Sequence, residues 1–87
     1  MKTKSAKSVL LDILLFLAKE KRPATRREIA KQIKRSYEGV RAAISEGLLQ
    51  GYIEEVKDDK IEKFRITEKG IQYLEEIKKQ IENAILT

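Results

Sequence analysis

Apolar residues follow a helical spacing over most of this chain, and the first such segment is apolar around most of its circumference. We predict a helix over about residues 8–19, with Ser5 or Ser8 as its N-cap and Pro23 beyond its end. Its large apolar residues are Val9, Leu10, Leu11, Ile13, Leu14, Leu15, Phe16 and Leu17. A helix this apolar needs cover on two sides, and the second cover is either another subunit or the chain's own C-terminal helix.

A shorter second helix follows, with a clear start signal. Thr25 and Glu28 have the spacing of a capping box, so this helix begins at Arg26. Ile29 and Ile33 are four residues apart and face the core. Residues 34–36 then form a tight turn into a third helix.

The third helix has both a start and a stop signal. Ser36 is its expected N-cap, and Gly51 is the left-handed residue at its end. The residues expected on its buried side are Val40, Ile44 and Leu48. Gly39 and Gly47 lower the intrinsic stability of the helix, so we expect a close neighbour at each of them.

An alternating pattern then predicts a β-hairpin, with strands over residues 52–57 and 60–66 around Asp58-Asp59. Alternation turns Phe64 and Ile66 inward and Lys63 and Arg65 outward. Because neither turn residue is glycine, we expect a longer tip rather than a tight mirror-image turn.

The last predicted helix starts after Thr67, its expected N-cap. Its apolar side carries Ile71, Leu74, Ile77, Ile81 and either Ile85 or Ala84. This spacing continues over about two heptads, so the helix could pair with its copy as a short coiled coil. The chain is therefore predicted to be α+β and mainly helical: a basic arm over residues 1–7, a main domain over residues 8–66 and a long C-terminal helix over residues 67–87.

Composition removes several kinds of chemistry. The chain has 87 residues and contains neither cysteine nor histidine, which excludes disulfides, zinc fingers, thiol nucleophiles and imidazole catalysis. No nucleophile–base pair or phosphate-cradling glycine loop is visible, so we expect no enzyme, no cofactor and no metal. The longest apolar run is too short to span a membrane, and a cytoplasmic location is expected.

Positive charge is concentrated in the first part of the chain. The formal net charge is +5, but residues 1–35 hold eleven lysines and arginines against three acidic residues. Such clustering suits a polyanion such as DNA, RNA or an acidic membrane surface. A merely solubilising surface is the simpler alternative.

Four stretches in this order resemble prokaryotic winged-helix transcriptional regulators, with archaeal members most similar. They are residues 25–30 (Thr-Arg-Arg-Glu-Ile-Ala), 36–41 (Ser-Tyr-Glu-Gly-Val-Arg), 51–54 (Gly-Tyr-Ile-Glu) and 64–70 (Phe-Arg-Ile-Thr-Glu-Lys-Gly). The resemblance covers about residues 8–86 and implies a winged helix-turn-helix that binds double-stranded DNA. Many such regulators dimerise through the helix that follows the last stretch, sometimes as an antiparallel coiled coil.

In a helix-turn-helix, the second helix of the motif enters the major groove and the preceding helix crosses the backbone. The candidates for base contacts are therefore Tyr37, Arg41, Ala42 and Ser45. Arg41 is the best placed for guanine, while Tyr37 is equally well explained as packing on the second helix. The candidates for backbone contacts are Arg26, Arg27, Lys31, Lys34, Arg35, Ser36, Lys60, Lys63 and Arg65, with Lys57 as a further lysine of the wing.

We predict a homodimer without a small-molecule ligand. Its interface candidates are Leu11, Leu15, Phe16, Leu74, Ile77, Ile81 and Ile85. A two-fold dimer would place its recognition helices about one DNA turn apart, on a roughly palindromic site. Two alternatives stay open: a non-specific architectural DNA-binding protein, and a winged-helix module for protein–protein interaction, which the acidic residues of the wing favour.

Overall fold

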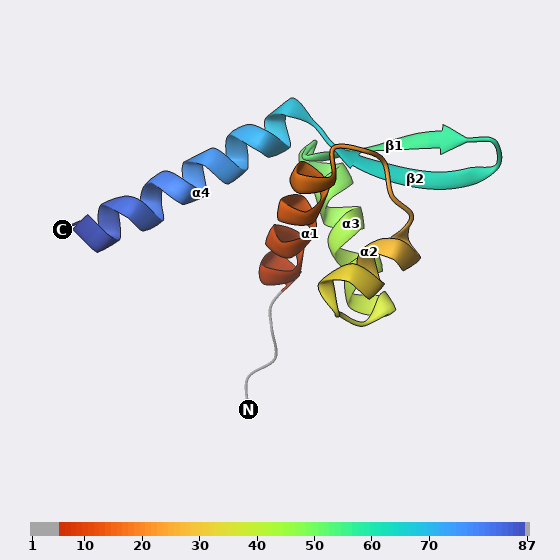
Figure 1. Ribbon diagram of the computed structural model, residues 1–87, viewed down its shortest axis with the longest axis horizontal. Coiled ribbons are helices and arrows are strands. Elements are labelled where there is room, and N and C mark those ends of the chain that lie inside the picture. Colours follow the sequence, from red (N-terminus) through yellow and green to blue (C-terminus); the bar gives the residue numbers. More distant parts are fainter. Residues whose placement is uncertain (1–5, 87) are drawn as a thin grey trace.

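The computed structural model describes residues 6–86, which form a three-helix body, a β-hairpin and a projecting helix (Figure 1). The elements are α1 (Ala6–Glu20), α2 (Arg26–Ile33), α3 (Tyr37–Gln50), β1 (Ile53–Asp58), β2 (Ile61–Ile66) and α4 (Glu68–Leu86). The predicted mainly helical α+β fold is confirmed. Residues 1–5, including most of the predicted arm and Ser5, lie outside the described residues.

Helix α1 begins earlier than predicted. It starts at Ala6, so Ser8 lies inside the helix and is not its N-cap. Ala6 and Lys7 are good helix formers, which is why the helix continues past Ser8 toward the N-terminus.

The core lies between α1, α2 and α3, and the hairpin closes it at one end. Its buried residues are Val9, Leu10, Ile13, Leu14, Leu17, Ala24, Ile29, Val40, Ala43, Ile44, Ile53 and Phe64. Large apolar side chains contribute about 1.5–3 kcal/mol each when fully buried. Because α1 supplies more of these residues than any other element, it is the central element of the body.

Helix α3 buries Val40 and Ile44 as predicted, but its third predicted core residue is wrong. Leu48 was expected in the core but is 36% exposed, while Ala43 and Gly47 are buried. A Cβ atom at Gly47 would lie 2.5 Å from Cδ1 of Ile53 and 3.1 Å from Cδ1 of Leu10. The missing side chain lets α1 and β1 approach α3 closely, and this orientation turns Leu48 outward. The close neighbour expected at Gly47 is thus confirmed.

The predicted caps of α2 and α3 are confirmed. The Thr25 hydroxyl accepts the backbone N–H of Glu28 at 3.1 Å, and the Glu28 carboxylate accepts that of Thr25 at 2.9 Å. Ser36 caps α3 by accepting the N–H of Gly39 at 3.1 Å, and Gly51 ends the helix with φ 81°. The close neighbour of Gly39 is this cap, because a Cβ atom there would lie 3.1 Å from the Ser36 hydroxyl.

The hairpin is shorter at its tip than the sequence predicted. Asp58 pairs with Ile61, so the turn consists of Asp59 and Lys60, one residue later than expected. The expected longer tip is wrong. Asp59 adopts φ 69°, a left-handed conformation that aspartate tolerates better than most residues, so a short turn forms here without a glycine. Phe64 is buried, as the alternation predicted.

A third strand position, which the sequence did not predict, ties the hairpin to the helices. Ala24, between α1 and α2, forms an antiparallel bridge with Phe64 through N···O distances of 2.9 and 2.8 Å. Both residues are buried. The base of the hairpin is therefore held by main-chain hydrogen bonds as well as by packing in the core.

Helix α4 leaves the body in the opposite direction from the hairpin (Figure 1). The predicted cap is confirmed: the Thr67 hydroxyl accepts the N–H of Gly70 at 3.1 Å and donates to the carbonyl of Gly51 at 2.6 Å. Gly70 lies against the carbonyl oxygen of Tyr52, where a Cβ atom would overlap it. The rings of Tyr52 and Tyr73 stack with centroids 4.5 Å apart. These contacts fix the first turns of α4 while its later turns project.

Candidate nucleic-acid interface

A groove of about 620 Å³ lies between the start of α2, the start of α3 and the tip of the hairpin. We call it the basic groove. Its lining residues are Thr25, Arg26, Arg27, Tyr37, Lys57, Lys60, Ile61 and Glu62. Cations thus outnumber carboxylates four to one around it. An anionic polymer would gain electrostatic energy along this surface.

The residues predicted to contact a nucleic-acid backbone divide into paired and unpaired cations. The paired ones are Arg26 with Glu62 at 2.8 Å, Arg35 with Asp12 at 2.5 Å, Lys63 with Asp58 at 3.2 Å and Arg65 with Glu54 at 2.6 Å. Within residues 6–86, no ion pair involves Arg27, Lys31, Lys34, Lys57 or Lys60. These unpaired cations can meet an external anion without losing an internal partner.

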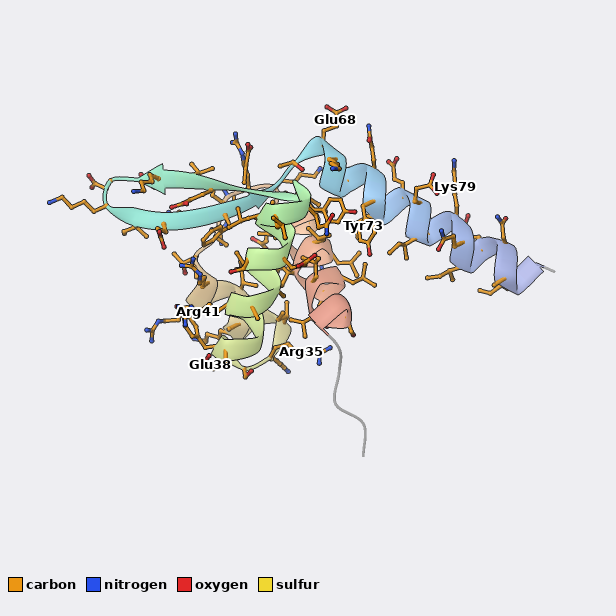
Figure 2. The ribbon with its side chains drawn as sticks, turned by 180° about the vertical axis from the view of Figure 1, so that it is seen from behind. Arg35, Glu38, Arg41, Glu68, Tyr73 and Lys79 are labelled. Carbon is orange, nitrogen blue, oxygen red and sulfur yellow. The ribbon has the colours of Figure 1, made fainter. Side chains whose placement is uncertain are left out.

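Arg35 points back toward α1 from the turn between α2 and α3 (Figure 2). Its Nη2 and Nε atoms donate to Oδ2 of Asp12 at 2.5 and 3.2 Å, and both side chains are partly buried. The sequence signal for this pair is Asp12 itself, since a lone carboxylate in an apolar helix needs a partner. Arg35 therefore anchors the turn of the motif to α1.

Arg26 is held from two sides at the edge of the basic groove. Its Nη1 atom donates to Oε1 of Glu62 at 2.8 Å, and its guanidinium carbon lies 4.6 Å from the centroid of the Phe64 ring. Its Nε atom is buried and has no hydrogen-bond partner among the described residues. Because Arg26 donates to it, the pKa of the Glu62 carboxyl is held below its usual value.

The candidates for base contacts are exposed together on α3. They are Tyr37, Arg41, Ala42 and Ser45, and Arg41 extends outward from the first half of the helix (Figure 2). Tyr37 is 45% exposed and lines the basic groove beside Arg26 and Arg27. This partial exposure is compatible both with packing beside α2 and with contact to a bound nucleic acid.

A second groove, of about 410 Å³, runs between α1 and α4, and we call it the apolar groove. Its lining residues are Leu11, Leu15, Ile71, Leu74, Glu75, Ile77, Lys78, Ile81 and Glu82. The groove brings together the predicted interface residues Leu11, Leu15, Leu74, Ile77 and Ile81. Leu15 is 53% exposed and Ile81 54% exposed, so α4 covers α1 only in part.

Two predicted interface residues lie elsewhere. Phe16 packs against the core and lines a groove of about 280 Å³ with Glu28 and Lys31 of α2. Ile85 is exposed near the end of α4, outside the lining of the apolar groove. Phe16 therefore lies apart from the other candidates, whereas Ile85 lies one helical turn beyond Ile81 on α4.

Among residues 6–86, no group of three or more His, Cys, Asp or Glu side chains is arranged to hold a metal ion. No helix in the same range combines the length and the apolar character needed to cross a membrane.

The solved structures to which this chain is similar include transcription regulators. The transcriptional regulator BldR from Sulfolobus solfataricus has a TM-score of 0.75 and 23% identity over 90% of this chain and 57% of that chain. A zinc-responsive MarR family member, Lactococcus lactis ZitR, has a TM-score of 0.68 and 27% identity over 98% of this chain and 58% of that chain. MepR, a transcription regulator of the Staphylococcus aureus multidrug efflux pump MepA, has a TM-score of 0.73 and 20% identity over 90% of this chain and 62% of that chain.

No protein-family model and no curated protein matches the sequence. The chain spans about three fifths of the length of the three similar structures, 57–62%. The likeness shows that this chain has the winged helix-turn-helix fold of these transcription regulators.

Proposed function

We propose that this chain is a transcriptional regulator that binds double-stranded DNA as a homodimer. The observation that carries the proposal is the basic groove, which the unpaired cations Arg27, Lys57 and Lys60 line together with Tyr37. The groove lies between the two helices of the motif and the wing, which is where a DNA backbone passes when the recognition helix enters the major groove. The regulators of similar fold support the same function.

In this proposal, α3 reads bases while α2 and the wing hold the backbone. Arg41 binds a guanine through its two-pronged guanidinium, and Tyr37, Ala42 and Ser45 contact neighbouring base edges or phosphates. The main phosphate contacts come from the unpaired cations Arg27, Lys31, Lys34 and Lys60. These contacts fix the register on the duplex without reading its sequence.

The second part of the proposal assigns the apolar groove to a second copy of this chain. Leu15 and Ile81 leave aliphatic surface open to water, and burying it drives association. Glu75, Lys78 and Glu82 border the groove with both signs of charge, so an antiparallel copy of α4 can pair with them. A two-fold dimer of this kind would present its two recognition helices to half-sites about one DNA turn apart.

Fluorescence anisotropy of a labelled mixed-sequence duplex tests DNA binding. The wild-type protein should bind at about micromolar concentration or tighter in about 50 mM salt and much more weakly in about 200 mM salt. The double variant Arg27→Glu and Lys60→Glu should lose this binding. The single reversal Lys60→Glu should already weaken binding, and its matched control is Lys79→Glu on the projecting part of α4 (Figure 2), which should bind much like the wild type.

A protein–protein interaction module remains the second candidate function, because the wing neutralises much of its own charge. Lys63 pairs with Asp58 and Arg65 pairs with Glu54. If the wild-type protein fails to bind any duplex even at low salt, the DNA proposal is wrong and the interaction module takes its place. An architectural protein would instead bind all duplexes alike, with a specificity ratio near one.

A further inference from the structure

Among the residues that line the basic groove, Glu62 alone is acidic. A carboxylate opposes the binding of a polyanion, so its presence at this position needs an explanation. Its Oε1 atom accepts a hydrogen bond from Nη1 of Arg26 at 2.8 Å, and both side chains remain partly open to solvent. The pair thus lies at the surface that DNA would approach.

Arg26 has contacts that do not depend on Glu62. Its guanidinium rests over the ring of Phe64, 4.6 Å from the ring centroid, and its Nε atom is buried. A guanidinium has five N–H donors, and the ion pair with Glu62 uses one of its terminal nitrogens. The stacking can therefore keep Arg26 in position while its terminal nitrogens exchange one oxygen anion for another.

A phosphate oxygen is the natural competitor for this position. Arginine binds carboxylates and phosphates with the same planar donor geometry. A phosphate at hydrogen-bond distance from Arg26 would come close to the carboxylate of Glu62, and two like charges in that space repel each other. The Glu62 carboxylate and a phosphate would therefore compete for the guanidinium of Arg26.

We propose that Glu62 is an internal stand-in for a DNA phosphate. Its carboxylate holds Arg26 while the basic groove is empty, and a backbone phosphate takes its place on Arg26 when DNA binds. This inference rests on the proposed DNA-binding function and adds a control of affinity to the same site. Because phosphate contacts carry no sequence information, Glu62 lowers the affinity for all duplexes alike.

Glu62→Gln tests the proposal, with Glu20→Gln as the matched control. Glu20 is a carboxylate that also pairs with an arginine, Arg22 at 3.3 Å, and neither of these two residues lines the basic groove. Both variants change the net charge equally. Fluorescence anisotropy with a mixed-sequence duplex should show Glu62→Gln binding about fivefold tighter than wild type, with a salt slope steeper by about one. Glu20→Gln should stay within about twofold of wild type.

A second variant shows whether the gain runs through Arg26. The double variant Arg26→Gln and Glu62→Gln should bind no more tightly than Arg26→Gln alone, while thermal unfolding checks that each variant is folded. The proposal is overturned if Glu62→Gln binds like Glu20→Gln, if it binds more weakly than wild type, or if Glu62→Gln tightens binding equally in the Arg26→Gln protein. Wild-type protein that binds no duplex at all would instead reject the proposed function, before any variant is compared.

Discussion

The two grooves of this molecule have opposite linings. Cationic side chains of α2 and the hairpin surround the basic groove, whereas aliphatic side chains of α1 and α4 form the apolar groove. The hairpin and α4 leave the three-helix body in opposite directions (Figure 1). The comparison teaches that one small core can carry two separate surfaces, one suited to an anion and the other to an apolar partner.

The two grooves also differ in how their residues relate to the core. The unpaired cations of the basic groove are exposed and make no contribution to the buried cluster. In the apolar groove, Leu74 also packs against the core. We therefore expect changes in the basic groove to alter binding alone, and some changes in the apolar groove to alter stability as well.

The largest expected effect is on stability, and it comes from a glycine at the point where α4 meets the base of the hairpin. Gly70 joins α4 to the base of the hairpin, where a Cβ atom would overlap the carbonyl oxygen of Tyr52. Gly70→Ala should cost about 3 kcal/mol of unfolding free energy, because a backbone atom cannot move aside cheaply. Gly47→Ala should cost about 1 kcal/mol, since Cδ1 of Ile53 can rotate away. Denaturant unfolding measures both, and equal losses would contradict this reading of the packing.

The next largest effect is the loss of self-association through the apolar groove. Leu15→Glu or Ile81→Glu places a charge where we propose that a second copy binds, and should weaken self-association by about 100-fold or more. Leu49→Glu is the control, since Leu49 is 79% exposed on α3 and does not line the apolar groove. Sedimentation velocity gives the masses. A wild-type protein that sediments as a monomer at all concentrations would contradict the proposed dimer.

A smaller effect is expected on DNA affinity when single cations on the DNA-binding surface are neutralised. Arg27→Gln and Lys60→Gln should each weaken DNA binding by roughly three- to tenfold and lower the salt slope by about one, whatever the duplex sequence. Arg41→Gln should instead relax preference at one base position, by about 1–3 kcal/mol. Anisotropy on a selected site and on its single-base variants separates the two patterns. If Arg41→Gln weakens binding equally to the selected site and to all of its single-base variants, Arg41 does not read a base.

The smallest effect is a pH dependence of the capping box at the start of α2. The Thr25 backbone N–H donates to the Glu28 carboxylate and lowers its pKa from the ordinary value of 4.5. This carboxylate therefore stabilises the fold above that value, and the contribution is lost as pH falls through the lowered pKa. Glu28→Gln should cost less than about 1 kcal/mol near neutral pH and flatten the acid limb of the stability curve. An unchanged acid limb would contradict it.

Local signals predicted much of this fold, because they act within a few residues. The capping box of Thr25 and Glu28 and the caps at Ser36, Gly51 and Thr67 depend on side chains near the helix ends they fix. These signals give the order and bounds of the elements to within about two residues. The face that each helix buries is less local, which is why Leu48 was placed wrongly.

Besides the start of α1 and the hairpin turn, the missed features are contacts between distant parts of the chain. Arg35 with Asp12, Arg26 with Glu62 and the bridge of Ala24 with Phe64 join residues on different elements. The spacing of apolar residues within one helix or strand does not indicate which distant residues will contact it, so these pairs could not be predicted. For the same reason, Ile61 and Glu62 were given no role in the basic groove, although both line it. The backbone-contact candidates could be named from position, but only the structure separates paired from unpaired cations.

The most direct test of the account is an NMR titration of the ¹⁵N-labelled protein with a short DNA duplex. The account predicts that amide signals of α2, the first half of α3 and the hairpin tip shift together, while those of the apolar groove do not follow DNA concentration. Shifts confined to α1 and α4, or no shifts at low salt, would contradict the assignment of DNA to the basic groove.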